Sequence, residues 1–331
     1  MQITKLGVNM EIRFGYVAMS VMLEHASPSK TVTLKSYTQL AGKDPTVALN
    51  KVRRTAMENL DNTMRLLRHN KAHGVKVFRF SSKLLPLATH PALTGWDYIE
   101  DLKDRLRLIG AFIRENKMRV SFHPDHYTLI NSPREEVLLS SLRDYEYHNS
   151  LLEAMGLDER ARLVTHVGGH YNDREGSIER FKINWCRVTE RVAGRLTLEN
   201  DDKTYTAQDV LNICNDLSLP MVLDLHHYKC NNKGENIIKL MPEIFKTWEL
   251  TGLPPKIHIS SPKSISNFRS HHDFVNPDDL YPFLVSARAF VSNIDVMVEA
   301  KQKDRAMFKL AKDLSSFPAI RQTGNATLII V

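Results

Sequence analysis

In the stretch from Arg195-Leu-Thr-Leu-Glu199 to Pro220-Met-Val-Leu-Asp-Leu225, two short β-rich runs enclose an amphipathic helical segment. A strand, a helix and a second strand in this order are typical of a βα unit in a parallel sheet. Each run carries a carboxylate at or near its end, where apolar residues normally dominate. The same pattern recurs in both directions along the chain.

The chain has 331 residues and contains eight such runs. The other six lie at Ile12 to Ala18, Val75 to Phe80, Arg119 to His123, Arg162 to Val167, Lys256 to Ser260 and Asp295 to Glu299. Eight βα units predict a single (β/α)₈ TIM barrel over residues 1–331, a length above the usual barrel of about 250 residues. We assign the surplus to insertions, above all to a long first βα loop from Met19 to Asn50.

The composition favours a soluble, cytoplasmic protein, for which we expect a monomer. No apolar run approaches the roughly 18 residues that a membrane span requires. The N-terminal segment Met1 to Val17 is interrupted by Lys5, Glu11 and Arg13, which argues against a targeting signal. The three cysteines show no CxxC spacing, so neither a disulfide framework nor a thiolate zinc site is expected. No GxxxxGK[ST] motif is present, so we expect no nucleotide cofactor.

Positive charge is concentrated in one part of the chain. The formal net charge is +7, and the segment Lys51 to Arg119 alone holds 15 Lys and Arg against 7 Asp and Glu. A local basic region suits a phosphate backbone, because neutralising phosphates releases condensed counterions. By charge alone, solvated helices explain the segment better, so a nucleic-acid partner must be argued from other residues.

In a parallel barrel, catalytic groups come from the C-terminal ends of the strands. Six successive runs end in metal-ligand residue types, which are His123, His166, Glu199, Asp224, His258 and Glu299. A single core histidine is usually held by one hydrogen bond. Six ligand types in step are poorly explained in that way, because unpaired buried charge is strongly unfavourable. We therefore predict a metal centre, and ligands without thiolates favour zinc, manganese or iron.

A second set of residues adds to this centre. His227 follows Asp224 by three residues, and His271 follows His258 by thirteen. Lys256 precedes His258 by two residues, so strand alternation puts both side chains on the same face. These ligands exceed the number that one metal ion uses.

Two histidines resemble a further site and are not assigned to one. His69 and His73 stand four residues apart on a predicted helix and could bind a metal together. Because the surrounding stretch is rich in arginine and expected to be exposed, we predict solvated side chains at both positions.

Several motifs occur in a fixed order along the barrel. They are Phe78-Arg-Phe-Ser-Ser, Ala88-Thr-His-Pro91, Ser121-Phe-His-Pro124, His166-Val-Gly-Gly169, Leu198-Glu-Asn-Asp-Asp-Lys-Thr-Tyr205, Leu223-Asp-Leu-His-His-Tyr228, Lys256-Ile-His-Ile-Ser-Ser-Pro262, His271 and Glu299-Ala-Lys-Gln-Lys303. In these motifs and their spacings the chain resembles the UV damage endonuclease family, a relative of endonuclease IV within the xylose isomerase-like barrels. Each motif alone is a weak signal, and the ordered set is specific.

The resemblance implies a cluster of three divalent metal ions, expected to be Mn²⁺, with Zn²⁺, Co²⁺ or Mg²⁺ as alternatives. Glu199 would bridge a first and a second metal. The remaining ligands would be His123 and His166 for the first metal, Asp224, His258 and Glu299 for the second, and His227 and His271 for the third. The resemblance also implies that Lys256 can be carboxylated. The alternative, an ammonium that binds phosphate, stays open.

Four further residues take substrate roles by the same resemblance. His90 matches a histidine beside the cluster, for which we favour contact with a substrate phosphate over metal ligation. The pair His126-Tyr127 stands where the family commonly has glutamine and an aromatic residue that probe the damaged duplex, so a wedge role is kept and the lesion preference is open. Tyr16 matches a tyrosine that packs against the flipped lesion. An aromatic residue that closes the barrel mouth is the alternative for Tyr16.

The predicted function is that of a bacterial-type DNA repair endonuclease that works at the nucleoid on damaged double-stranded DNA. It would nick immediately 5′ to cyclobutane dimers and 6-4 photoproducts, with abasic sites as a further substrate. Neighbouring metals can lower the pKa of bound water and clamp both oxygens of an in-line displacement. The main alternative is a two-metal sugar isomerase or epimerase, which needs fewer ligands and a small enclosed pocket. A DNA-binding module without chemistry would need no such ligand set.

Overall fold

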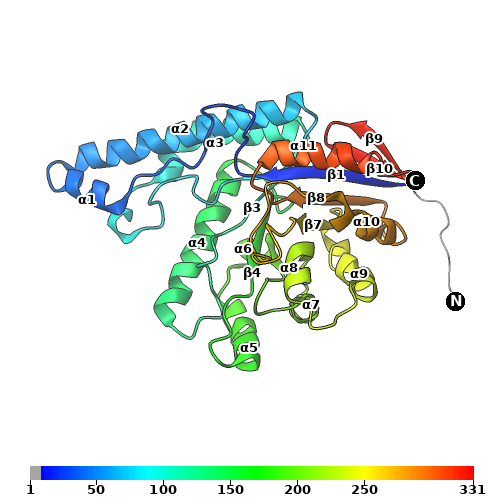
Figure 1. The fold of residues 1–331 in the computed structure, drawn as a ribbon. Coiled ribbons are helices and arrows are strands. Elements are labelled where there is room, and N and C mark those ends of the chain that lie inside the picture. The colour runs from blue at the N-terminus through cyan, green and yellow to red at the C-terminus, as the bar shows by residue number, and fades with distance from the viewer. Residues whose placement is uncertain (1–8) are drawn as a thin grey trace.

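A computed structural model describes residues 9–331 of the chain (Figure 1). Residues 1–8 of the N-terminal segment Met1 to Val17, on which the targeting prediction rests, lie outside the described residues. None of the helices within the described range is long and apolar enough to cross a membrane.

Eight parallel strands form a closed barrel. They are β1 (Met10–Val17), β2 (Val77–Arg79), β3 (Arg119–Phe122), β4 (Arg162–His166), β5 (Leu196–Glu199), β6 (Met221–Asp224), β7 (Lys256–Ile259) and β8 (Asn293–Val298). Each strand pairs with the next in sequence, and β1 pairs with both β2 and β8, which closes the ring. The predicted (β/α)₈ barrel is confirmed, and all eight predicted runs overlap an observed strand.

Helices surround the barrel and bury their apolar faces against it. The helices are α1 (Leu34–Ala41), α2 (Pro45–Ala72), α3 (Tyr98–Glu115), α4 (Glu135–Ala154), α5 (Arg174–Trp185), α6 (Glu190–Ala193), α7 (Ala207–Leu217), α8 (Leu225–Cys230), α9 (Ile237–Lys246), α10 (Tyr281–Ala287) and α11 (Lys303–Leu314), with the 3-10 helices η1 (Pro91–Leu93), η2 (Glu249–Thr251) and η3 (Pro277–Asp279). In Figure 1, α1 and the start of α2 project past the barrel, with α3 beside α2.

The segment from Met19 to Asn50, predicted to be one long loop, is partly helical, so the first βα loop is shorter than predicted. It contains α1 and the first turn of α2. Thr33 caps α1 by accepting a hydrogen bond from the Ser36 N–H, and Asp44 caps α2 ahead of Pro45. A capping side chain followed by proline is a helix-start signal that the sequence displays.

Charged and polar side chains occupy much of the barrel interior. At the end where the strands begin, Arg13 and Arg119 share the buried carboxylate of Asp295. Lys256 on β7 pairs in register with Asp295, and its side-chain nitrogen lies 3.2 Å from the Ser121 hydroxyl, across the barrel on β3. The residues of the predicted metal centre form the top level. The main apolar core lies between barrel and helices, and a small second cluster of Val164, Val222, Trp248 and Leu253 lies apart from it, with Val164 and Val222 on the inward faces of their strands.

A C-terminal hairpin lies outside the predicted pattern. Its strands are β9 (Ile320–Gly324) and β10 (Thr327–Ile330), and β10 pairs antiparallel with the first half of β1. Figure 1 shows the hairpin beside the start of β1, at the opposite end of the barrel from the strand ends that carry the ligands.

Candidate metal centre

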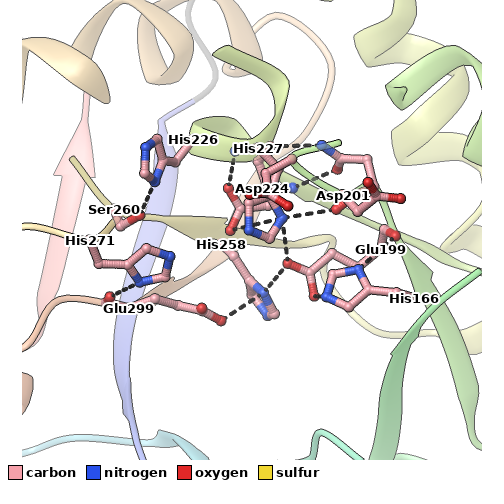
Figure 2. Close-up of polar contacts among 12 residues, drawn as sticks. His166, Glu199, Asp201, Asp224, His226, His227, His258, Ser260, His271 and Glu299 are labelled. Atoms are coloured by element: carbon pink, nitrogen blue, oxygen red, sulfur yellow. Dashed lines mark hydrogen bonds and ion pairs between the residues drawn. The ribbon is translucent and has the colours of Figure 1, made fainter. Parts of the chain in front are cut away.

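Six side chains from six strand ends converge inside the mouth of the barrel, as predicted. The carboxylate of Glu199 lies at their centre: its Oε2 is 3.0 Å from His123 Nε2 and 4.0 Å from His166 Nε2, and its Oε1 is 2.9 Å from His258 Nδ1. The His258 Nδ1 is also 3.0 Å from the Glu299 Oε1. Figure 2 shows Glu199 between His166 and His258, with Asp224 and His227 above.

The ligand atoms fall into two groups that share Glu199. One group joins His123, His166 and Glu199, and the other joins Glu199, Asp224, His258 and Glu299. Within each group all ligand atoms lie within 4.8 Å of one another, so each group could hold a metal ion. This division is the one that the family resemblance implies for the first and second metals.

The orientation of the histidine rings fits metal ligation. The Nδ1 of His123 lies 2.9 Å from the Pro124 carbonyl, and that of His166 lies 3.2 Å from the Glu199 carbonyl. Because a carbonyl can only accept, Nδ1 carries the proton and the Nε2 lone pair faces the centre. His123 Nε2 and Glu199 Oε2 lie 3.0 Å apart, so a proton or a metal ion must lie between these two atoms. Asp224 Oδ2, which is buried and has no hydrogen-bond partner, points to the same need.

The two histidines expected for a third metal show the same orientation. His227 Nδ1 lies 2.9 Å from the Asn200 carbonyl, and His271 Nδ1 lies 2.6 Å from the Glu299 carbonyl. Both rings therefore keep Nε2 free, and their centroids are 6.5 Å apart. Two protein ligands would leave most of the coordination sphere of a third metal ion to water or substrate, so such a site would be more open than the two groups that share Glu199.

Charges within the centre shift its pKa values in opposite directions. Burial raises the pKa of Glu199, but the charges of His258 and His166 outweigh burial and hold it well below its usual range. Burial lowers the pKa of His258, and the charges of Glu199 and Glu299 more than reverse this, to about 9. Burial likewise opposes the carboxylates around His227, whose pKa also rises to about 9. In the metal-free protein, the protons on His258 and His227 therefore supply the positive charge that metal ions would otherwise supply.

Arg79 is a residue of the centre that the strand-end argument missed. It closes β2, and its guanidinium forms an ion pair with Glu299. Burial of Glu299 raises its pKa, but the charges of Arg79 and His258 outweigh burial and hold it well below the usual range. The signal was present, because Arg79 stands at the C-terminal end of the second strand, within the motif Phe78-Arg-Phe-Ser-Ser.

Lys256 is buried one level below the ligands, on the same face of β7 as His258. Burial, followed by the charge of Arg119, holds the pKa of its amine well below the usual range. The neutral amine is the form that reacts with carbon dioxide, whereas a buried neutral amine is a poor phosphate ligand. The environment therefore favours the carboxylation reading over the phosphate-binding one.

Two of the quoted motifs serve the backbone around the centre. In His166-Val-Gly-Gly169, Gly168 adopts φ +120°, and a Cβ there would collide with the Asn131 side-chain oxygen. The Asn131 amide nitrogen in turn donates to the Gly169 carbonyl at 2.7 Å. After Glu199, the Asp201 carboxylate accepts hydrogen bonds from the following turn, including the Tyr205 N–H at 2.9 Å. These contacts fix the chain directly behind two ligands.

The predicted lesion contact of Tyr16 is wrong for the conformation observed. The side chain is 0% exposed, and its hydroxyl donates to the Asn70 side-chain oxygen at 2.6 Å. Strand alternation explains the error, because Arg13 and Val17 face the barrel interior while Tyr16 faces α2 and packs against Phe78. Tyr16 therefore belongs to the layer between barrel and helices.

The other predicted substrate residues lie at the surface or in loops. His126 and Tyr127 follow β3, both are exposed, and their ring centroids are 4.0 Å apart. His90 begins η1, where its Nδ1 accepts a hydrogen bond from the Ala92 N–H at 3.1 Å. Its Nε2 is thus the ring nitrogen available to a substrate. The roles of these three residues stay predictions.

The basic segment and its histidines are more engaged than expected. Arg53 pairs with Asp101, and Arg105 pairs with Asp61, so part of the predicted positive charge is neutralised. His69 is not solvated as predicted, because its Nε2 lies 3.1 Å from the buried carboxylate of Asp304 on α11. That contact ties α2 to α11.

Comparison with known proteins identifies the family to which the chain is related. The model of the UV-endonuclease UvdE family matches residues 12–329. The UV DNA damage endonuclease of Bacillus velezensis is 39% identical over 96% of this chain and 99% of its own length. That of Halalkalibacterium halodurans is 42% identical over 94% and 96%.

Solved structures agree with the sequence relatives. The crystal structure of SacUVDE superimposes with a TM-score of 0.79 at 31% identity, covering 92% of this chain and 98% of that one. Endonuclease IV from Thermus thermophilus, at 11% identity and a TM-score of 0.53, covers 92% of this chain and 98% of its own and shares the fold alone. The sugar isomerase alternative is set aside by these findings, and the chain belongs to the family of UV DNA damage endonucleases, enzymes that act on DNA.

Proposed function

We propose that this protein nicks duplex DNA immediately 5′ to UV photoproducts by metal-dependent phosphodiester hydrolysis, without a nucleotide cofactor. Cyclobutane dimers and 6-4 photoproducts are the proposed substrates, and abasic sites a further one. The observation that carries the proposal is the pair of ligand groups that share Glu199 at the C-terminal end of the barrel. A binding protein without chemistry has no use for such a buried set of carboxylates and oriented imidazoles.

Three divalent cations, with manganese favoured, would be held by the predicted ligands. His123 and His166 with Glu199 fit the first, and Glu199 with Asp224, His258 and Glu299 fits the second. His227 and His271 would supply protein ligands to the third. When bound, such ions polarise phosphate oxygens, lower the pKa of a water molecule and stabilise the charge on the leaving oxygen.

The chain's own side chains prepare this centre for a phosphate. Arg79 holds the Glu299 carboxylate by an ion pair and so limits its rotation. Backbone carbonyls fix the imidazoles of four ligands, so little reorganisation is required when substrate arrives. His90, through Nε2, is proposed to contact a phosphate, and His126 with Tyr127 to probe the damaged base stack.

At the level of the whole chain, we propose a single catalytic barrel domain that acts as a monomer in the cytoplasm, at the nucleoid. The family match over residues 12–329 supports one domain.

The deciding experiment uses an end-labelled duplex with one cyclobutane dimer, incubated with the protein and manganese but no nucleotide. We expect one nick 5′ to the dimer, a 3′-hydroxyl that a polymerase extends, and no product in chelator. An intact duplex of the same sequence is the control. A covalent protein–DNA adduct trapped by borohydride would instead indicate a lyase with an amine nucleophile, and cutting at abasic sites alone would remove photoproducts as substrates.

A further inference from the structure

The loop after β7 presents an aliphatic side chain to solvent. Ile265 stands near the middle of the segment between Ser260 and His271, and its side chain is 98% exposed. An isoleucine side chain left in water forgoes the favourable free energy that its burial would contribute. Because single exposed apolar residues are common on protein surfaces, exposure alone assigns no role to this residue.

The loop that carries Ile265 is held rigid. Its two arms meet in a bridge between Pro262 and His271, and the Lys263 N–H donates to the Ser270 carbonyl at 2.7 Å. Its turn is closed by the Asn267 N–H, which lies 3.2 Å from the Ser264 carbonyl. The exposed side chain is therefore held out by an ordered hairpin.

Two further contacts anchor the same loop to the metal centre. The His226 Nε2 lies 2.7 Å from the Phe268 carbonyl, and its Nδ1 lies 2.6 Å from the Ser260 hydroxyl (Figure 2). Arg269 forms an ion pair with Asp202 at 2.6 Å, in the segment after Glu199. A preorganised projection loses little conformational entropy when it inserts into a partner.

The loop lies opposite the predicted lesion probe. In a closed ring of eight strands, β7 and β3 are four strands apart, so the loops that follow them face each other across the barrel mouth. Tyr127 in the loop after β3 is 73% exposed. Two exposed, apolar-tipped loops therefore flank the metal centre on the same face of the barrel.

The charge of the loop indicates which class of partner it binds. Between Ser260 and His272 the sequence contains no carboxylate and two cations, Lys263 and Arg269, of which Arg269 is paired with Asp202. Such a tip suits a partner that has anionic groups outside and apolar layers between which a side chain can insert. Duplex DNA, with stacked bases between phosphate backbones, is such a partner.

We propose that Ile265 inserts into the damaged duplex from the side opposite Tyr127, so that the lesion is unstacked between two wedges. The inference rests on the proposed function and names a second specificity-determining residue for it. Apolar side chains wedged between base steps unstack and kink DNA, and a photoproduct, which is already badly stacked, offers less resistance.

The test is the variant Ile265→Ala, read by fluorescence of 2-aminopurine placed next to the photoproduct and followed in stopped flow before the nick forms. Wild-type protein should raise the fluorescence as bases unstack. Ile265→Ala should reduce that rise and weaken binding of the damaged duplex by about tenfold, with intact-duplex binding unchanged. Ile265→Leu, which keeps the aliphatic bulk, should restore both readouts.

Leu250 offers a matched control. Its side chain is 92% exposed, but it lies on η2, at the end of the barrel where the strands begin. Leu250→Ala should change neither readout. An unchanged fluorescence rise in Ile265→Ala, or an equal loss of affinity for damaged and intact duplex, would overturn the wedge. If either result is found while the wild-type protein nicks damaged DNA normally, only the wedge is overturned and the proposed function stands. A wild-type protein that cannot nick damaged DNA would overturn the proposed function instead.

Discussion

Glu199 belongs to both ligand groups, and its Oε2 lies next to His123 while its Oε1 lies next to His258, so the two oxygens are placed to serve two different cations. Glu199→Gln should keep the barrel folded and reduce cleavage by on the order of 10²–10³, because an amide is a poor bridging ligand. Binding of damaged DNA should persist in part, since phosphate contacts elsewhere are unchanged. Cleavage rates and melting curves check this, with the exposed Glu136→Gln on α4 as a control. Cleavage within a few-fold of wild type would remove Glu199 as the bridge.

The raised pKa values of His227 and His258, both about 9, predict how metal binding depends on pH. Their folded pKa lies above the ordinary 6.5, so their ion pairs stabilise the metal-free protein below pH 6.5, and this contribution is lost as pH rises through about 9. Metal must displace these protons. Loading at pH 7 should release about two protons, and the affinity should rise toward pH 9. Calorimetry in buffers of different ionisation enthalpy measures the release, and none at pH 7 would contradict the assignment.

Tyr16 is expected to act on stability and not on recognition. Tyr16→Phe removes the hydrogen bond to Asn70 inside the helix layer, which should lower the free energy of unfolding by about 1 kcal/mol. The ratio of damaged to intact duplex binding should stay the same, because the ring never reaches the surface. Denaturant unfolding and binding assays check both parts. A changed ratio at unchanged stability would restore the lesion contact.

At the scale of elements, strand ends were readable from the sequence because two patterns coincide there. The β-rich runs give the period of the barrel, and a ligand residue type at the end of six of the eight runs marks the C-terminal end of the strand, as at His123 and Asp224. The side of the strand to which each side chain points was harder to predict. Tyr16 and Arg13 are an odd number of positions apart on β1, so Arg13 points into the barrel interior and Tyr16 points to the helix layer. The ion pair of Arg79 with Glu299 and the contact of His69 with Asp304 join elements remote in sequence. The sequence therefore marks the position of Arg79 at a strand end, but it does not identify the partner of either residue.

The loop after β3 should govern lesion discrimination. Its exposed pair His126 and Tyr127 lies at the surface with the two rings tilted against each other, and an aromatic ring there can replace an extruded base. Tyr127→Ala should reduce the ratio of damaged to intact duplex binding more than it changes the salt dependence, because phosphate contacts set the latter. Titrations of both duplexes at several salt concentrations separate the two effects. An equal ratio in variant and wild type would mean that Tyr127 only shapes the loop.

For the whole molecule, the polar barrel interior is the feature that links fold to function. Arg119 and Asp295 toward the base, Lys256 next to Asp295 and the candidate ligands at the mouth form a charged column, which shares the interior with Val164 and Val222. Such a column is stable only if its charges balance, and the top level contains a surplus of carboxylates and lone pairs without bound cations. Metal ions should therefore stabilise the fold as well as supply chemistry.

The purified protein should accordingly contain close to three divalent ions per chain after dialysis. Removing them with a chelator should abolish nicking and lower the melting temperature, because ligands held near one another repel without cations between them. Adding manganese back should restore both, and His271→Ala should lose about one ion with little change in fold, since its ring lies at the open third site. Elemental analysis combined with thermal unfolding provides the measurement. Full activity with one ion or none would exclude the three-metal arrangement, and a melting temperature indifferent to the chelator would show that the charged column balances without metal.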